Sequence, residues 1–132
     1  MPMDLYHQQI FDLYKNPLSK GVLENPTWSR HEINPTCGDE VTVYCLVENG
    51  KVTNMTHQGH GCAISQASAS LLTDEAAEKT LEELSMITPN HVVEMLGIEL
   101  GPTRLKCALL PLQAITRGIA AWRRGQNEIL QG

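Results

Sequence analysis

The chain has 132 residues, a hydrophobic fraction of 42% and a formal net charge of −5. This length suits one domain with its own core, expected here over residues 1–132, and the hydrophobic fraction excludes intrinsic disorder. The negative charge excludes a general attraction to nucleic acid or to an anionic membrane, so neither is an expected partner. No apolar run of transmembrane length and no signal-peptide pattern is found, so we expect a cytoplasmic protein.

The first half of the chain predicts one helix followed by three strands. Apolar residues at helical spacing indicate a helix over 4–14. Runs rich in β-branched and aromatic residues predict strands over 29–34 and 41–48. The pair Asn49-Gly50 is typical of a tight hairpin, because both residues accept positive φ. It predicts that residues 51–58 return as an antiparallel third strand.

The second half of the chain predicts helices. Residues 63–72 are rich in alanine and serine, which gives a slim helix that can pack closely on a neighbour. Thr80 and Glu83 have the spacing of a capping box at the start of a short helix over 80–86. Another helix is expected from 88 to 95, opened by a proline and ended by Gly97.

The last helix is expected to begin near Cys107 and to accommodate Pro111 in its first turn. The element order then predicts an α+β fold. It consists of an N-terminal helix, a three-stranded antiparallel meander sheet and a helical C-terminal half packed on that sheet.

The four cysteines are more typical of reduced, metal-bound or reactive thiols than of disulfides in such a protein. Cys45 lies within the β-type run 41–47 and has no glycine or carboxylate beside it. We interpret it as a small buried hydrophobic residue. Cys37, Cys62 and Cys107 differ, because each lies beside a turn or an expected helix start.

These three cysteines and Asp39 predict a four-ligand metal site. Gly38 permits a tight turn that points the Asp39 carboxylate back toward Cys37. Cys62 and Cys107 are both expected at helix N-termini, where free N–H groups and the helix dipole stabilise a thiolate; Lys106 adds a positive charge beside Cys107. Three thiolates and a carboxylate attract a divalent cation, and thiolate-rich sets suit zinc or iron–sulfur chemistry.

Three alternatives stay open on residues alone. His60, between two glycines, can be a further ligand, a proton carrier or an ordinary polar surface residue. A hydrolase that pairs cysteine with histidine is possible, although no spacing defines a base or an oxyanion hole. A purely structural zinc site is the third alternative. The remaining histidines show no ligand spacing and are expected to be ordinary surface or strand residues: His7, His31, His57 and His91.

Three stretches together resemble the U-type iron–sulfur assembly scaffolds, the IscU/SufU family that also forms the N-terminal part of NifU. They are Asn-Pro-Thr-Cys-Gly-Asp at 34–39, Gly-His-Gly-Cys-Ala-Ile-Ser-Gln-Ala-Ser-Ala-Ser at 59–70, and Arg-Leu-Lys-Cys at 104–107. The resemblance covers essentially the whole chain and the combination is highly specific.

The resemblance implies a sulfur-accepting scaffold. A cysteine desulfurase would supply persulfide sulfur to Cys107, with Cys37 and Cys62 as further possible acceptors. Iron and sulfide would then form a [2Fe–2S] cluster, which the scaffold passes to apo iron–sulfur proteins. The implied metal ligands are Cys37, Asp39, Cys62 and Cys107, and the residues implied around them are Gly38, His60, Gly61, Arg104 and Lys106.

Some features resemble only one branch of the family. IscU-type members carry histidine before the last cysteine, whereas Lys106 stands here, as in SufU-type members, which implies a zinc-dependent sulfurtransferase as the alternative function. SufU-type members have an insertion between their last two ligand cysteines, and the segment 62–107 is too short to contain it. Residues 100–104 replace the Leu-Pro-Pro-Val-Lys motif of IscU, so the Hsp70-type chaperone is not an expected partner.

Overall fold

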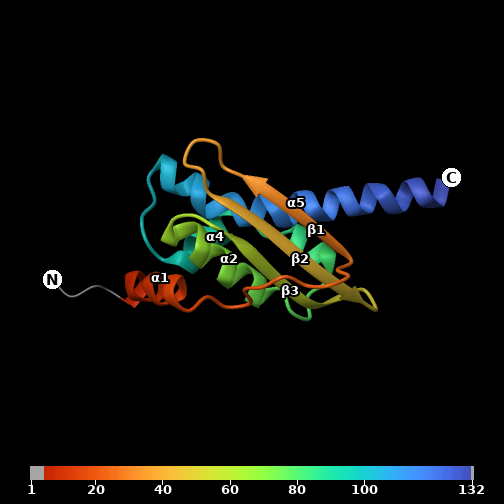
Figure 1. Ribbon diagram of the computed structural model, residues 1–132, viewed down its shortest axis with the longest axis horizontal. Coiled ribbons are helices and arrows are strands. Elements are labelled where there is room, and N and C mark those ends of the chain that lie inside the picture. The colour runs from red at the N-terminus through yellow and green to blue at the C-terminus, as the bar shows by residue number, and fades with distance from the viewer. Residues whose placement is uncertain (1–4, 132) are drawn as a thin grey trace.

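The computed structural model describes residues 5–131, with side chains up to residue 125 (Figure 1). It has the α+β order expected from the sequence: one helix, three strands, then helices. Asp4, the first residue of the expected N-terminal helix, lies outside the described part. The elements are α1 (Leu5–Lys15), β1 (Trp28–Ile33), β2 (Glu40–Glu48), β3 (Lys51–His60), α2 (Ala63–Glu75), α3 (Leu81–Ser85), α4 (Pro89–Leu96) and α5 (Pro102–Gln131).

The sheet is an antiparallel meander in the order β1-β2-β3. Asn49 and Gly50 form its predicted hairpin, with φ values of 54° and 79°. Side chains of β2 alternate between the two faces, and one face contributes Val41, Val43 and Cys45 to the core. Helices α2 and α5 cover that face (Figure 1), and the opposite face is open.

Helix α2 packs closely against α5 because its side chains are small. Ala67, Ala69 and the hydroxyl-bearing Ser68 and Ser70 are all fully buried. Buried hydroxyls need partners, and the Ser68 hydroxyl donates a hydrogen bond of 2.6 Å to the carbonyl of Ala108 in α5. The slim helix predicted from the alanine and serine content is therefore confirmed, and it sets the position of α5 beside the sheet.

The start of α5 differs from the prediction. The helix begins at Pro102, where a proline fits because the first helical N–H has no intrahelical partner, and the Leu105 N–H already bonds to the Gly101 carbonyl at 2.9 Å. Cys107 consequently lies in the second turn and not at the N-terminus. The expectation that Pro111 occupies the first turn is also wrong, since it lies inside the helix.

The short helices end and begin as the sequence predicts. Thr80 and Glu83 make both hydrogen bonds of a capping box at α3. Thr88 caps α4, and Gly97 ends it in the left-handed conformation, with φ of 68°. Among the described residues, no helix combines the length and apolar character that crossing a membrane requires.

The segment between α1 and β1 is fixed to the sheet through His57. The His57 side chain is fully buried, and its Nε2 lies 2.9 Å from the Leu18 carbonyl. Ser70 of α2 accepts a hydrogen bond from the Leu18 N–H at 3.1 Å. His57 is a strand residue, as expected, but it is a core residue and not a surface one.

Candidate metal centre

A compact loop between β1 and β2 presents the first two predicted ligands. The Asn34 N–H donates to the Asp39 carbonyl and the Gly38 N–H donates to the Asn34 carbonyl, both at 2.8 Å. The Asn34 side-chain oxygen accepts a further bond from the Thr36 N–H at 3.1 Å. Gly38 has φ of 78°, a conformation that glycine adopts without steric cost. Backbone hydrogen bonds therefore fix the direction in which Cys37 and Asp39 leave the loop.

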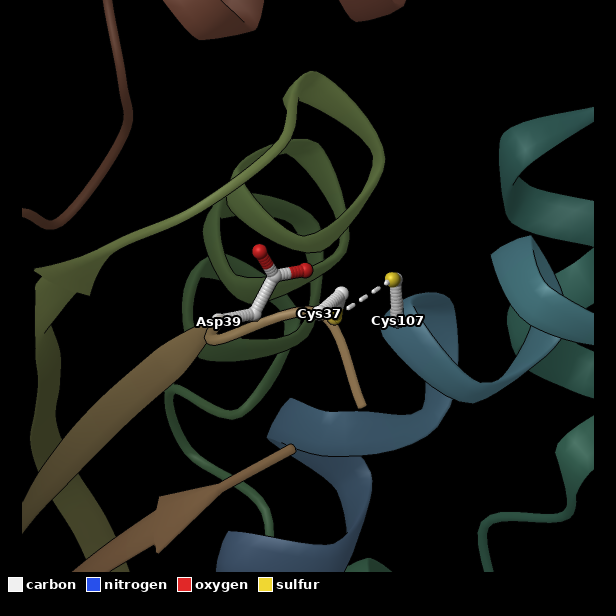
Figure 2. A group of neighbouring side chains, drawn as sticks. All are labelled: Cys37, Asp39 and Cys107. Carbon is white, nitrogen blue, oxygen red and sulfur yellow. Dashed lines mark hydrogen bonds between the residues drawn. The ribbon is translucent and has the colours of Figure 1, made fainter. Parts of the chain in front are cut away.

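Cys37 and Asp39 meet Cys107 from α5 (Figure 2). The Cys37 and Cys107 sulfur atoms lie 3.4 Å apart. One donor atom from each of the three residues falls within 4.8 Å of the others, close enough for one metal ion to contact all three. Asp39 and Cys107 are buried, whereas Cys37 is exposed, so the cluster is open to solvent on one side.

The Asp39 carboxylate has one oxygen that is hydrogen-bonded and one that is free to contact a cation. Its Oδ1 accepts a hydrogen bond of 3.1 Å from the Cys62 N–H, while its Oδ2 is buried and has no hydrogen-bond partner among the described residues. Burial opposes ionisation, but hydrogen bonds from Cys107, Cys37 and Cys62 outweigh it and hold the pKa of this carboxyl below its ordinary value. A buried carboxylate oxygen without a partner is costly, and a bound cation would satisfy it.

Gly61 allows this arrangement because it has no side chain. A Cβ at this position would lie 2.6 Å from the Asp39 carboxyl carbon, which is closer than atoms in contact can approach. The glycine before Cys62 thus lets the β3–α2 connection pass directly over the carboxylate.

Cys62 shares the cavity but does not join the three-residue cluster. It is the N-cap of α2, as expected, and its sulfur lies 4.0 Å from the Ser65 hydroxyl. It lines the same cavity as Cys37 and Cys107, although its sulfur falls outside the group of donors within 4.8 Å. The structure therefore brings three of the four predicted ligands together and places the fourth at the rim.

Cys107 does not have the environment that the sequence suggested. It is 3% exposed in the second turn of α5, away from the helix N-terminus. Burial, and then its contacts with Asp39 and Cys37, raise the pKa of the thiol. Lys106 faces a separate hollow beside Pro35 and does not line the sulfur cavity. The predicted place of Cys107 at a helix N-terminus is therefore wrong, and Lys106 turns to another hollow.

The sulfur cavity has a volume of about 510 Å³, and its walls come from α1, α2, α5 and the loops beside them. Besides the three thiols it is lined by His7, Ile10 and Phe11 of α1, and by Arg104 of α5. The position of Arg104 agrees with its predicted place around the ligands. His7 was not predicted, because its spacing from the cysteines carries no signal until α1 packs on α2 beside the cavity.

His60 does not reach the thiols. It ends β3 on the open face of the sheet, and its Nε2 lies 3.3 Å from Glu40 Oε1. It does not line the sulfur cavity. Of the three alternatives for His60, the geometry fits an ordinary polar surface residue, which here contacts a carboxylate.

The fold and the cluster define a class: small α+β proteins with a solvent-accessible cluster of thiols and one carboxylate, suited to a soft metal. The family model of the NifU-like N-terminal domain matches residues 5–128. The chain therefore belongs to this family, and the resemblance seen in the three motifs is confirmed.

Relatives in this family have two kinds of names. The chain is 33% identical over 125 residues to the iron–sulfur cluster assembly scaffold protein IscU 1 of Archaeoglobus fulgidus, covering 95% of this chain and 81% of the relative. It is 35% identical over 133 residues to the zinc-dependent sulfurtransferase SufU of Bacillus subtilis, covering 88% and 90%. A crystal structure from Fervidobacterium islandicum, named as a scaffold protein for the SUF system, superposes with a TM-score of 0.76 at 29% identity, covering 85% and 94%.

Proposed function

We propose that this protein is an iron–sulfur cluster assembly scaffold, with Cys37, Asp39, Cys62 and Cys107 as the site that receives sulfur and iron. The observation that carries the proposal is the buried Oδ2 of Asp39, which has no hydrogen-bond partner in the described part of the chain and lies beside two thiols within metal-binding distance. The names of the relatives support it independently. The [2Fe–2S] cluster is cargo in this reaction, so a site that is partly open suits both assembly and release.

Sulfur transfer begins at a thiol that a partner can reach. A thiolate of the scaffold attacks the terminal sulfur of a persulfide on the desulfurase; a new S–S bond forms, and the desulfurase cysteine leaves as a thiolate. Cys37 and Cys62 are exposed, whereas Cys107 is buried. Cys107 remains the proposed final acceptor, because its sulfur lies 3.4 Å from that of Cys37 and can take the sulfur over by a second exchange.

Partners follow from this chemistry. A cysteine desulfurase would dock over the mouth of the sulfur cavity, and apo iron–sulfur proteins would take the finished cluster from the same side. We place these events in the cytoplasm, where reduced cysteines persist. No role is assigned to an Hsp70-type chaperone.

The second candidate is a zinc-dependent sulfurtransferase that relays persulfide sulfur to another assembly protein. The 35% identity to SufU of Bacillus subtilis favours it, as does a donor set of thiolates and one carboxylate, which also suits tetrahedral zinc. Zinc would be held by Cys37, Asp39, Cys62 and Cys107 and would stabilise their thiolates against the burial that raises the pKa of Cys107.

One anaerobic experiment separates the two functions. Metal-free protein receives ferrous iron, cysteine, a reductant and a cysteine desulfurase, with zinc as competitor, and visible absorbance is followed. We expect a cluster spectrum that survives desalting. Retained zinc, stimulated desulfurase turnover and no cluster band would establish the sulfurtransferase instead.

A matched pair of cysteine variants tests the site within the same experiment. Cys107→Ser should lower persulfide labelling of the protein and abolish the cluster spectrum, because it removes a ligand and the final acceptor. Cys45→Ser should leave both unchanged, since Cys45 lies in the core away from the cavity. Equal labelling of the two variants would remove Cys107 from the proposal.

A further inference from the structure

Two of the three thiols in the sulfur cavity are in direct contact (Figure 2). The Cys37 and Cys107 sulfur atoms lie 3.4 Å apart, although 70 positions separate the two residues in sequence. Cys37 belongs to the loop between β1 and β2, and Cys107 to the second turn of α5, so only the folded chain brings them together. A disulfide bond joins sulfur atoms about 2.05 Å apart. The pair is therefore one short approach away from a covalent bond.

The approach that a disulfide requires is within reach of side-chain rotation. The two sulfur atoms must come closer by about 1.4 Å, and turning the Cα–Cβ bonds of the two cysteines moves them on this scale. Two thiolates that share one tetrahedral zinc, each about 2.3 Å from the ion, lie about 3.8 Å apart. The observed contact thus falls between the separation in a metal site and the separation in a disulfide.

The other two cysteines are not placed to compete for this bond. Cys45 is buried in the apolar core and does not line the cavity. Cys62 lines the cavity, but its sulfur falls outside the group of donors within 4.8 Å and lies 4.0 Å from the Ser65 hydroxyl instead. Position therefore selects one pair among the four thiols of the chain.

The two thiols of the pair differ in how a small oxidant reaches them. Cys37 is exposed at the open side of the cluster, whereas Cys107 is 3% exposed behind it. An accessible thiol that reacts first, with a second thiol in contact that resolves it, is the arrangement by which a sulfenic acid is converted into a disulfide. Exposure assigns the first role to Cys37, and contact assigns the second to Cys107.

We propose that Cys37 and Cys107 form a reversible disulfide on reaction with a peroxide, and that this bond closes the site to metal. The Cys37 sulfur attacks one oxygen of hydrogen peroxide; an S–O bond forms, the O–O bond breaks, and water leaves with the thiol proton. The Cys107 sulfur then attacks the Cys37 sulfur; an S–S bond forms, the S–O bond breaks, and a second water leaves. The two thiols together give up two electrons, which reduce the peroxide.

The disulfide and a bound metal exclude each other. Cys37 and Cys107 supply two of the three donors that meet at the site, so their oxidation leaves the Asp39 carboxylate without a thiolate beside it. A thiol reductant restores both sulfurs by exchange, and the disulfide keeps them short of irreversible sulfinic acid. The inference goes beyond the proposed function and does not depend on it, because it needs only the contact of two sulfurs.

Mass spectrometry of the full chain under non-reducing conditions tests the pairing. Metal-free protein is treated with hydrogen peroxide, the remaining thiols are alkylated, and digestion after Glu40 separates Cys37 from Cys45. We expect one linked pair of peptides that contains Cys37 and Cys107, with Cys45 and Cys62 alkylated. Cys45→Ser and Cys62→Ser should form the same link, whereas Cys37→Ser should form none.

Zinc gives a second readout on the native protein. Zinc bound before the peroxide should slow the link by about tenfold or more, because thiolates that hold an ion do not attack peroxide freely. The oxidised protein should bind zinc only after dithiothreitol has reduced it.

Three results would overturn the proposal. They are a main product that links Cys62 to either of the other thiols, sulfinic acid on Cys37 with Cys107 still alkylated, and oxidised protein that binds zinc as tightly as reduced protein. A chain that forms the expected link but assembles no cluster would support this inference and count only against the proposed function.

Discussion

The protein buries cysteine in two different regions, and the second of them is the candidate metal centre. In the middle of the sheet, Cys45 is fully buried among apolar side chains, and burial alone raises the pKa of its thiol to about 12. At the end of the sheet, Cys107 is nearly as buried, but it touches Cys37 and faces a carboxylate with an unpartnered oxygen. The first region is complete as it is, whereas the second would gain stability from a bound cation.

The difference teaches that burial does not identify a functional thiol; unsatisfied neighbours do. Cys45 behaves as a small hydrophobic residue and has no polar group to complete. The region around Cys107 gathers donors that repel one another when ionised, which costs folding free energy until a cation joins them. Four predictions separate the two regions.

The largest effect is expected for loss of a ligand. Cys107→Ser should weaken zinc binding on the order of 100-fold, because a hydroxyl is a poor substitute for a thiolate on a soft metal. Competition with a chromophoric chelator measures it. A variant that binds zinc as tightly as the native protein would show that Cys107 is not a ligand.

Cys45→Ser should act on folding and not on metal. Its hydroxyl would be buried among apolar side chains without a built partner, which costs about 1–3 kcal/mol of unfolding free energy. Urea unfolding of the metal-free protein gives this value, and chelator competition should show native zinc affinity. Weakened zinc binding in this variant would contradict the separation of the two regions.

His57 gives the core region a dependence on pH. Burial, together with nearby Lys20 and against the hydrogen bond to Leu18, lowers the pKa of His57 below its ordinary value of 6.5. His57 therefore binds a proton more readily in the unfolded chain than in the folded protein. The unfolding free energy that neutral His57 contributes is fully present above pH 6.5 and is lost as pH falls below it, by at most about 1.4 kcal/mol per pH unit.

Urea unfolding at about pH 7.5 and about pH 5.5 checks this expectation. The native protein should lose more unfolding free energy on acidification than His57→Gln, whose amide does not titrate. Carboxyl groups such as Asp39 do not interfere, because their ordinary pKa of 3.8 lies below this range. Equal losses in the two proteins would mean that His57 is not held neutral by the fold.

The smallest effect is expected at the loop that carries Cys37. Asn34→Ala removes the acceptor of the Thr36 N–H and a weak contact of 4.0 Å from the Asn34 amide to the Cys107 sulfur. Loss of one such hydrogen bond costs about 0.5–1.5 kcal/mol, which corresponds to roughly threefold to tenfold in zinc affinity. Asn34→Ser should recover most of it, since its hydroxyl still accepts from Thr36. A serine variant as weak as alanine would assign the effect to the sulfur contact.

Local sequence signals predicted most of the fold, because turns and helix ends are decided by hydrogen bonds between residues close in sequence. Asn49-Gly50 accepts the positive φ of the hairpin, and Thr80 with Glu83 completes its own capping box. The start of α5 was misplaced because a proline both ends and begins helices. Pro102 occupies the first helical position, five residues before the predicted start near Cys107.

The candidate site was predicted in its residues but not in its geometry. The identities of Cys37, Asp39, Cys62 and Cys107 indicate which donor atoms are available, while tertiary packing decides which of these atoms meet. Tertiary structure moved Cys107 into the second turn of α5 and left the Cys62 sulfur at the rim. Side chains gathered by strand pairing, such as those of His31 and His60 around Glu40, leave no trace in local patterns.

Pro111 has a mechanical consequence for this site. A helical N–H bonds to the carbonyl four residues earlier, and proline has none, so the Cys107 carbonyl is left without its helical donor. The ladder of α5 is thus interrupted directly behind the sulfur-bearing turn, while Ala114, Ile115 and Ile119 hold the following turns in the core. With one backbone hydrogen bond fewer, this turn of α5 is expected to open more easily than the turns behind it, and amide hydrogen exchange would measure the difference, although Ala108 and Leu110 keep it packed in the core.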